Sequence, residues 1–408
     1  MLTVVVGGGA AGMMSAYFCA LNGEKTLLIE QNEKLGKKLY ITGKGRCNVT
    51  NDCDEEEFLT NVVTNSRFMR GAIWSFPPAE VIEFLQNGGL ALKTERGNRV
   101  FPLSDKSSDV IKCFERQLNR VGVQIMLNCA VTDLIAENGQ IKGVQTTKGY
   151  FECEKVIVCT GGKSYPSTGS TGDGYKFAKK LGHTVLPIRP ALCGIDLKGA
   201  NFPALAGLSL KNVSLTVFKE QKQIYTDFGE LLFTHTGVSG PLIISASSYI
   251  SKEGAGNYSI SIDLKPALDE KTLDARLLRD FAQFKGKNLK NAMVELLPRS
   301  LIPEVIYHAG ISGEICVSEL SATDRKKVLT ALKKLTYSVK NLRSIEESIV
   351  TGGGVNVKEI NPKTMESKIV KGLYFAGEVL DIDALTGGFN LQCAFSTAYC
   401  AGNACKKD

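Results

Sequence analysis

The amino-acid sequence predicts an α/β protein with a parallel sheet, interrupted by an insert of different texture. Three observations predict this fold class. A short apolar strand at residues 4–6 runs directly into a cluster of glycines. A second apolar run, residues 26–29, follows one helix later and ends at an acidic residue. Two further apolar strands, residues 155–160 and 373–376, also lead into glycines, so the pattern of strand and glycine returns late in the chain.

The first of these patterns is typical of a dinucleotide-binding βαβ unit in a Rossmann-like fold. Gly7 would make the tight turn, Gly9 would let the backbone approach a pyrophosphate, and Gly12 would let the next helix, residues 13–22, pack on the strand. Glu30 falls eighteen residues after Gly12, where a carboxylate that binds a ribose belongs. A glycine-rich turn in a fold that binds no nucleotide is the alternative interpretation.

The middle of the main domain predicts a basic loop and further α/β elements. Residues 36–48 form a loop rich in glycine, lysine and arginine, whose charges lie where phosphates would be. The hydrophobic pattern then predicts helices at residues 78–87 and 109–121 and strands at residues 124–128, 130–136 and 141–147.

The insert shows two kinds of periodicity. Apolar residues alternate at 208–217 and 258–264, as expected for half-buried strands. Helical spacing follows at 273–281 and 328–335, the second after a capping-box pattern at residues 321–324.

These patterns predict a discontinuous main domain and a two-part insert. We expect the main domain to cover residues 1–187 and 347–408. The insert then has a β-rich part at residues 188–265 and a helical part at residues 266–346.

Composition excludes several classes of protein. No apolar stretch is long enough to span a bilayer, and we expect no signal peptide, because the N-terminus lacks a basic region followed by a hydrophobic segment. Twelve cysteines without a Cys-x-x-Cys pair predict reduced thiols in the cytoplasm, not a disulfide framework or a metal site. The net charge of +7 permits anionic ligands without requiring nucleic acid.

The final block indicates which dinucleotide is bound. The strand at residues 373–376 is followed by Gly377-Glu378-x-x-Asp381, and a glycine pair then opens a helix. This arrangement offers a carboxylate for a polyol and backbone N–H groups at a helix N-terminus. FAD needs both, because its ribitol chain lies between the pyrophosphate and a ring that becomes anionic when reduced, whereas NAD needs neither. The predicted cofactor is therefore FAD.

The chain resembles the RdsA/BaiN/aminoacetone-oxidase family of bacterial FAD-dependent flavoproteins (YhiN-like) over nearly its whole length. The motifs that carry the resemblance are residues 36–51, 161–174 and 233–241 and the final block, residues 372–392. More distantly, the chain is similar to fumarate-reductase-type flavoproteins. The resemblance implies a glutathione-reductase/fumarate-reductase-like FAD-binding domain. Ala384 and Cys393 depart from the glycine and the aromatic residue expected there, and both changes bear on the ring pocket.

The resemblance also implies a non-covalent FAD site. It places Glu30 on the adenosine ribose, the backbone of Val131 near the adenine, and Asp381 at the ribitol. The residues expected to contact the cofactor are Gly7, Gly9, Ala10, Ala11, Gly12, Glu30, Gln31, Lys38, Thr42, Gly43, Gly45, Arg46, Cys47, Asn48, Val131, Thr160, Gly161, Gly162, Asp173, Gly377, Glu378, Asp381, Gly388, Phe389, Asn390 and Leu391.

Within the basic loop, the expected roles differ. Lys38, Arg46 and Asn48 would lie along the pyrophosphate and flavin side. Lys44 and Arg46 would neutralise the pyrophosphate, with an anionic substrate or a nicotinamide phosphate as alternatives. The same charges would lower the pKa of the Cys47 thiol and favour its thiolate.

Two residues are candidate proton donors. His235 lies in a Thr-His-Thr-Gly segment, expected to be a loop that faces the main domain, and histidine titrates near physiological pH. Tyr165 precedes a proline and would stack near the ring or donate a proton. The alternatives are a histidine that orders its loop and a tyrosine that only packs.

The predicted function is that of an FAD-dependent oxidoreductase that moves a hydride between a small organic substrate and flavin N5. Within the resemblance, an NAD(P)H-fed reductase of enone-like or steroid-like substrates competes with an oxygen-using oxidase of a small amine. The chain has no second glycine fingerprint, so NAD(P)H would bind only transiently. An RNA-directed or RNA-binding flavoprotein is the alternative from another class, motivated by a pI of about 8.7 and the lysines of residues 326–340; nucleic acid is not the expected partner. The sequence leaves the oligomeric state open.

Overall fold

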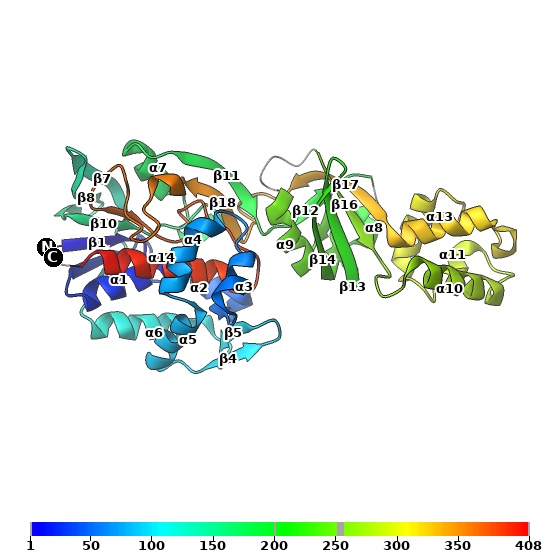
Figure 1. Cartoon of the computed structure of the whole chain (residues 1–408), viewed down its shortest axis with the longest axis horizontal. Helices are drawn as coiled ribbons and strands as arrows, with labels where there is room; N and C mark the ends of the chain where they lie inside the picture. The colour runs from blue at the N-terminus through cyan, green and yellow to red at the C-terminus, as the bar shows by residue number, and fades with distance from the viewer. Residues whose placement is uncertain (1, 200, 251–256, 407–408) are drawn as a thin grey trace. The chain divides into compact units, whose positions relative to one another are not determined.

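The computed structural model describes residues 2–199, 201–250 and 257–406. They divide into two compact units, one formed by Met1–Ala191 with Ile345–Asp408 and the other by Leu192–Ser344 (Figure 1). Each unit has its own apolar core.

The first unit is built on a five-stranded sheet in which every neighbouring pair is parallel. Val4, Val5 and Leu28 are fully buried, as expected for central strands covered on both faces. This sheet confirms the predicted Rossmann-like α/β class. Its strands, in spatial order, are β19 (Leu373–Phe375), β10 (Lys155–Val158), β1 (Leu2–Val6), β2 (Lys25–Ile29) and β6 (Gln124–Met126).

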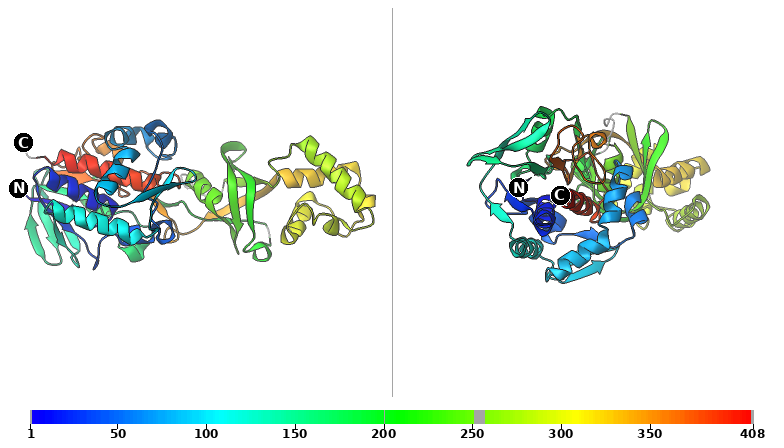
Figure 2. Two further views of the ribbon diagram at one scale, coloured as in Figure 1. Left: turned by 90° about the horizontal axis from the view of Figure 1, so that it is seen from below. Right: turned by 60° about the vertical axis from the view of Figure 1, so that its left-hand side comes forward.

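Two helices that are far apart in sequence pack against each other on this sheet. They are α1 (Ala10–Leu21) and α14 (Phe389–Ala404), which lie side by side in Figures 1 and 2. A Cβ on Gly402 would lie 2.8 Å from the Cβ of Phe18, so the glycine allows the close approach. The other helices of the unit are α2 (Lys37–Ile41), α3 (Glu55–Thr60), α4 (Ser66–Ser75), α5 (Pro78–Asn87), α6 (Ser107–Arg120) and α7 (Asp173–Lys180), with 3₁₀ turns at Thr42–Gly45, Pro166–Thr168 and Val357–Glu359.

Three small antiparallel sheets complete the first unit. They are β7 (Val131–Glu137) with β8 (Gln140–Thr146) and β9 (Gly149–Glu152); β3 (Thr50–Asn51) with β5 (Arg99–Pro102) and β4 (Leu92–Glu95); and β11 (Val185–Ala191) with β18 (Val350–Val355). Gly352, Gly353 and Gly354 lie inside β18, and a side chain at Gly353 would overlap the Pro187 carbonyl oxygen of β11.

The second unit contains a closed six-stranded barrel whose strands are interspersed with helices along the chain. In spatial order, the barrel strands are β12 (Ile195–Leu197), β15 (Gly237–Ser239), β14 (Lys222–Phe233), β13 (Ser209–Lys219), β16 (Tyr258–Asp263) and β17 (Leu335–Leu342). The helices are α8 (Phe202–Leu205), α9 (Pro241–Ile250), α10 (Glu270–Gln283), α11 (Leu289–Ala292), α12 (Ile302–Ala309) and α13 (Ala322–Lys333), with 3₁₀ turns at Arg299–Leu301 and Val317–Glu319.

One expectation for this unit is wrong at its end. Helical spacing predicted a helix through Leu335, but α13 ends at Lys333 and Leu335 opens the strand that closes the barrel. Leu335, Tyr337 and Val339 point inward with period two, and this alternation determines the strand. The capping box at Ser321 and Asp324 is present as predicted.

The lengths and compositions of the helices bear on whether the chain could cross a membrane. Across residues 2–199, 201–250 and 257–406, no helix is both long enough and apolar enough to cross a bilayer.

Candidate functional site

The loops that follow β1, β10 and β19 meet at one edge of the parallel sheet. Because these strands are neighbours and run in the same direction, their carboxyl ends lie together, which is where ligands bind in such sheets. The loops begin at Gly7, Cys159 and Ala376, and backbone hydrogen bonds continue the sheet into each of them. The glycine segments singled out in the sequence are therefore brought together by the topology.

The glycines of the first loop differ in what surrounds them. A Cβ on Gly7, whose φ is +102°, would lie 2.6 Å from the Cys159 carbonyl oxygen, and one on Gly12 would overlap the Gly7 carbonyl oxygen. A Cβ on Gly9 would have no protein atom within 4 Å. Folding therefore requires glycine at positions 7 and 12, whereas the space beside Gly9 and the start of α1 is open.

Glu30 holds the glycine loop to its neighbours. Its Oε2 accepts a hydrogen bond from the Gly8 N–H at 2.7 Å, and its Oε1 accepts from the Asn32 backbone at 2.8 Å. Its carbonyl accepts from the Cys129 N–H, which places the start of β7, and with it Val131, next to Glu30. The side chain of Gln31 donates to the Gly169 carbonyl. Glu30 and Val131, assigned to the two ends of adenosine, are close in the fold.

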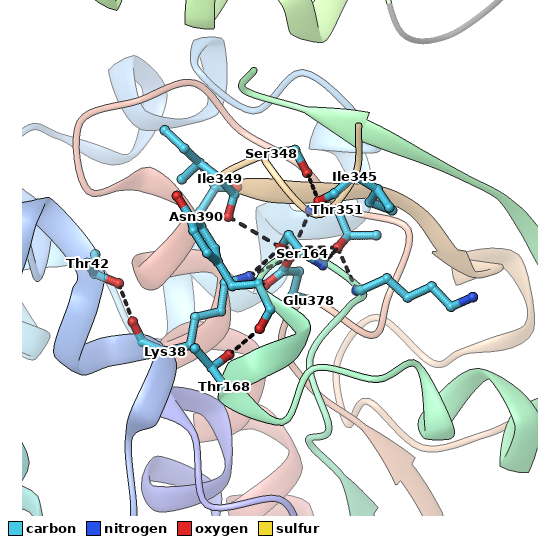
Figure 3. Close-up of polar contacts among 12 residues, drawn as sticks. Lys38, Thr42, Ser164, Thr168, Ile345, Ser348, Ile349, Thr351, Glu378 and Asn390 are labelled. Atoms are coloured by element: carbon cyan, nitrogen blue, oxygen red, sulfur yellow. Dashed lines mark hydrogen bonds and ion pairs between the residues drawn. The ribbon is translucent and has the colours of Figure 1, made fainter. Parts of the chain in front are cut away.

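Figure 3 shows a polar network around Glu378. Lys38 Nζ donates to Glu378 Oε2 at 2.7 Å and to Ser164 Oγ at 2.6 Å, and Ser164 Oγ donates to Glu378 Oε1 at 3.0 Å. The Thr351 N–H donates to Glu378 Oε1 at 2.8 Å. Burial raises the pKa of Glu378, but the Lys38 charge and these hydrogen bonds outweigh it and hold that pKa below its ordinary value. The network joins four segments at the site.

Sequence reasoning missed two members of this network. The sequence patterns singled out neither the hydroxyl of Ser164 nor that of Thr351. Thr351 Oγ1 accepts from the backbone N–H groups of Lys163 and Ser164, so it fixes the loop after β10. A Cβ on Gly162 would overlap Thr351 Oγ1, so the glycine pair has a local structural role.

The guanidinium of Arg46 is paired with two carboxylates within the first unit. Its Nε donates to Asp105 Oδ1 at 2.7 Å, its Nη2 pairs with Glu95, and its guanidinium stacks on the Phe101 ring. Hydrogen bonds from Arg46 and from Lys93 lower the pKa of both carboxyls. The guanidinium is thus paired with residues far along the chain, and its assignment to the pyrophosphate stays a prediction.

Cys47 also departs from the prediction. The thiol is fully buried, and burial raises its pKa instead of lowering it as the neighbouring charges predicted. Its φ of +60° lies in the left-handed region, and its side chain belongs to the apolar core although Lys44 and Arg46 are close in sequence. Cys47 is therefore a structural thiol.

We expect Cys47 to be inert toward thiol reagents in the native protein. Iodoacetamide at neutral pH should modify the half-buried Cys316 first, because the thiolate is the nucleophile and a buried thiol with a raised pKa supplies almost none. Peptide mapping after timed alkylation measures the order. Modification of Cys47 before Cys316 would contradict the burial argument.

Three buried polar atoms at this edge have no hydrogen-bond partner among the described residues. They are Oδ1 of Asn48, Oγ1 of Thr160 and Oδ1 of Asp381; the nearest cation to the last is Nη1 of Arg189 at 4.0 Å. Leaving such an atom unpaired costs about 1–3 kcal/mol. All three belong to the set expected to contact the cofactor, and hydroxyls and amides of a bound polyol and ring would supply the missing partners. The residues present therefore fit FAD.

The N-terminus of α14 is fixed at the same edge. Gly388 has a φ of +103°, and a side chain there would overlap the Thr50 backbone of β3. Asn390 clamps the preceding loop, because its Oδ1 accepts from the Ala384 N–H at 3.0 Å and its Nδ2 donates to the Ala384 carbonyl at 2.8 Å. Phe389 is buried, and Asp381 Oδ2 accepts from Asn65 Nδ2 at 2.8 Å. The first N–H groups of this sixteen-residue helix thus follow closely after Asp381, the residue assigned to the ribitol.

The remaining candidates lie on three other segments of the chain. Asp173 opens α7 and pairs with Lys176 at 2.6 Å, and the Thr171 hydroxyl donates to it as well. Tyr165 follows the network residue Ser164 and has a φ of +53°, a strained conformation for an aromatic residue. His235 belongs to the second unit, where it is exposed in the connection between β14 and β15.

A protein-family model described as the HI0933-like protein Rossmann domain matches residues 1–404. The chain belongs to this family. The match confirms the resemblance drawn from the motifs, and members of the family are FAD-dependent oxidoreductases, so this chain is one as well.

Two kinds of curated relative match almost the whole chain. One is the 3-dehydro-bile acid delta(4,6)-reductase of Clostridium scindens, 29% identical over 406 residues that cover 98% of each chain. The other is the ribosomal RNA dihydrouridine synthase, 30% identical in Escherichia coli (99% of this chain, 97% of that protein) and 29% in Haemophilus influenzae (97% and 96%).

Solved structures share the fold at low identity. A flavocytochrome c3 fumarate reductase in its open conformation is 18% identical, with a TM-score of 0.51, over 99% of this chain and 78% of that one. The 3-ketosteroid-delta4-(5alpha)-dehydrogenase of Rhodococcus jostii RHA1 is 14% identical, with a TM-score of 0.55, over 100% and 96%. Both confirm the predicted architecture.

Proposed function

We propose that this oxidoreductase reduces a carbon–carbon double bond conjugated to a carbonyl group, with electrons from NADH or NADPH. The observation that carries the proposal is the chemistry shared by the two kinds of relative. A delta(4,6)-reductase of a 3-oxo steroid saturates a double bond conjugated to the ketone. Dihydrouridine is uridine with its 5,6 double bond saturated, and that bond is conjugated to the C4 carbonyl. Reduction of a double bond conjugated to a carbonyl group is therefore the reaction that the names of both kinds of relative imply.

We propose that the cofactor is bound without a covalent bond along the sheet edge. Glu30 and Val131 would hold the adenosine, the open space beside Gly9 and the N-terminus of α1 would hold the pyrophosphate, and Asp381 would hold the ribitol. When bound, FAD supplies the hydride-transfer chemistry. The N-terminus of α14 stabilises negative charge beside it by about 0.3–1 kcal/mol from its dipole alone.

Reduction of a conjugated double bond also needs a proton at the carbon next to the carbonyl. We propose Tyr165 as its donor, because it lies in the same unit as the cofactor residues and its strained backbone is held by the Thr168 N–H and hydroxyl, both bonded to its carbonyl. Tyr165→Phe should lower turnover by about 10²–10⁴-fold while flavin reduction by the nicotinamide stays unchanged. His235→Gln is the matched comparison, and a loss of turnover there with none at Tyr165 would reverse the assignment.

A second candidate function is the reduction of uridine in ribosomal RNA. Two full-length relatives with that name favour it over the oxidation of a small amine, which no observation here favours. The two candidates differ in substrate size and not in chemistry, so product analysis separates them. The product of either reaction is heavier than its substrate by two hydrogens, in the steroid or in a nucleoside released from digested RNA.

The test of the proposal starts from the purified yellow protein. Anaerobic addition of NADH and then NADPH should bleach the flavin absorbance rapidly with one of them. Bleaching by neither, together with bleaching by small amines, would contradict the proposal and indicate an oxidase.

A further inference from the structure

The outer face of the barrel in the second unit is unusual in composition. Strand positions that point away from a barrel core face solvent and carry mostly polar side chains. Here, seven of them carry only hydroxyls, and all seven are exposed or half-exposed. They are Ser214, Thr216, Thr226, Ser259, Ser261, Thr336 and Ser338. We call this set, with Phe218 and Phe228, the hydroxyl face.

The register of the barrel places four of these hydroxyls in one continuous row across four strands. Thr226 pairs with Thr216, Thr216 with Ser261, and Ser261 with Thr336, which gives one row from β14 to β17. Hydrogen bonds of 3.2 Å between Thr226 and Thr216 and of 3.4 Å from Thr336 to Ser261 run along this row. Because each hydroxyl can make up to three hydrogen bonds, most of their capacity remains for a ligand.

Aromatic rings lie beside the rows of hydroxyls. Phe228 pairs with Ser214 at one side and its side chain is 55% exposed, which is a large apolar surface for a strand position. Phe218 pairs with Ser259 in the neighbouring row. The face therefore offers flat ring surface next to short hydrogen-bonding groups.

The charges around the hydroxyl face favour an anionic ligand. Asp263, which pairs with Ser214 in the barrel register, is neutralised by Lys333 at 2.6 Å, and the exposed Glu230 accepts a hydrogen bond from the uncharged Ser209. Lys340 is exposed on β17, two residues after Ser338. The sequence of Leu192–Ser344 contains 20 Lys and Arg against 15 Asp and Glu, so five of the seven net positive charges of the chain lie in this unit.

We propose that the hydroxyl face binds single-stranded RNA, the strand that carries the uridine to be reduced. This inference rests on the second candidate function. Serine and threonine hydroxyls donate to phosphate and ribose oxygens, exposed aromatic rings stack on bases, and outer faces of small barrels bind oligonucleotides in the same way. Lys340 and the net charge of the unit supply the electrostatic attraction that such binding needs.

The test measures binding without turnover. A fluorescein-labelled oligouridine is titrated with the FAD-loaded full chain, and its anisotropy is followed at several salt concentrations. Wild type should bind at low salt and release the RNA as salt rises. Ser338→Glu, which puts a carboxylate on the face, should weaken binding about tenfold. Phe228→Ala should weaken it by about fivefold or more through lost stacking.

Matched variants keep the proposal falsifiable. Thr330→Glu on α13 and Tyr307→Ala on α12, whose ring is 70% exposed, change the same chemistry elsewhere in the unit and should bind as wild type does. No RNA binding by wild type at low salt would overturn the proposal, and so would equal binding by wild type and Ser338→Glu. Flavin reduction by NAD(P)H is measured separately on each variant. This measurement distinguishes a variant that has lost reductase activity from one that has lost only RNA binding.

Discussion

The Gly9→Val protein is expected to fold normally and to lose its flavin. No protein atom lies within 4 Å of a Cβ placed on Gly9, and its backbone is extended, so the protein itself tolerates a side chain there. The valine would instead occupy the space that a pyrophosphate must enter to reach the N-terminus of α1. We expect circular dichroism and melting close to wild type, and a flavin-to-protein absorbance ratio near zero.

Gly12→Val is the matched control in the same motif. Its side chain would overlap the Gly7 carbonyl oxygen, so this variant should fail to fold rather than merely lose its cofactor. A Gly9→Val protein that retains the full flavin spectrum would contradict the assignment of the first glycine motif to the cofactor.

Lys38→Met should destabilise the protein by about 2 kcal/mol at neutral pH. The substitution removes three hydrogen bonds to Glu378 and Ser164 and leaves Glu378 without a cation in the part of the chain that the structure describes. Hydrogen bonds to charged groups contribute about 1.5–3 kcal/mol each when buried, and this pair is only partly buried, so we expect the sum to be reduced. Urea denaturation measures the difference.

The pH dependence of this effect has a defined sign. Because the pKa of Glu378 is held below its ordinary value of 4.5 in the folded protein, the Lys38 pair contributes stability above that pH and loses it as the pH falls further. The gap between wild type and Lys38→Met should therefore be largest at neutral pH and should shrink in acid. Lys38→Met with Glu378→Gln should cost less than the two single changes added together. A gap that is independent of pH would contradict the ion pair as its cause.

The parts of the fold that sequence predicted well are those encoded locally. The turn at Gly7 and the capping box at Ser321 each follow from a few adjacent residues whose backbone demands are strict, whereas the helix predicted from residue 13 begins at Ala10. The alternation at Tyr258 to Leu264 likewise gave a strand. Leu335 was misassigned because its spacing fits the end of a helix and the start of a strand equally well, and only the unpaired edge of the barrel decides between them.

The candidate site was predicted less completely, because its electrostatics depend on residues distant in sequence. Arg46 pairs with Glu95 and Asp105, which lie 49 and 59 residues away, and no local pattern indicated this. The pKa of Cys47 was assigned from neighbouring charges, whereas burial determines it. Thr160 and Asp381 share an edge because the parallel strands that precede them, β10 and β19, end there, whereas Asn48 lies in the basic loop before β3; the cofactor roles of all three stay predictions.

The central claim, that reduced flavin passes its electrons to a double bond conjugated to a carbonyl, is tested most directly by anaerobic reoxidation. The flavin is first reduced with NADH or NADPH, and then either a steroid enone or a ribosomal RNA fragment is added without oxygen. We expect the oxidised absorbance to return with one of them, together with a product heavier by two hydrogens. A flavin that stays reduced with both substrates and is oxidised only by oxygen would contradict the claim.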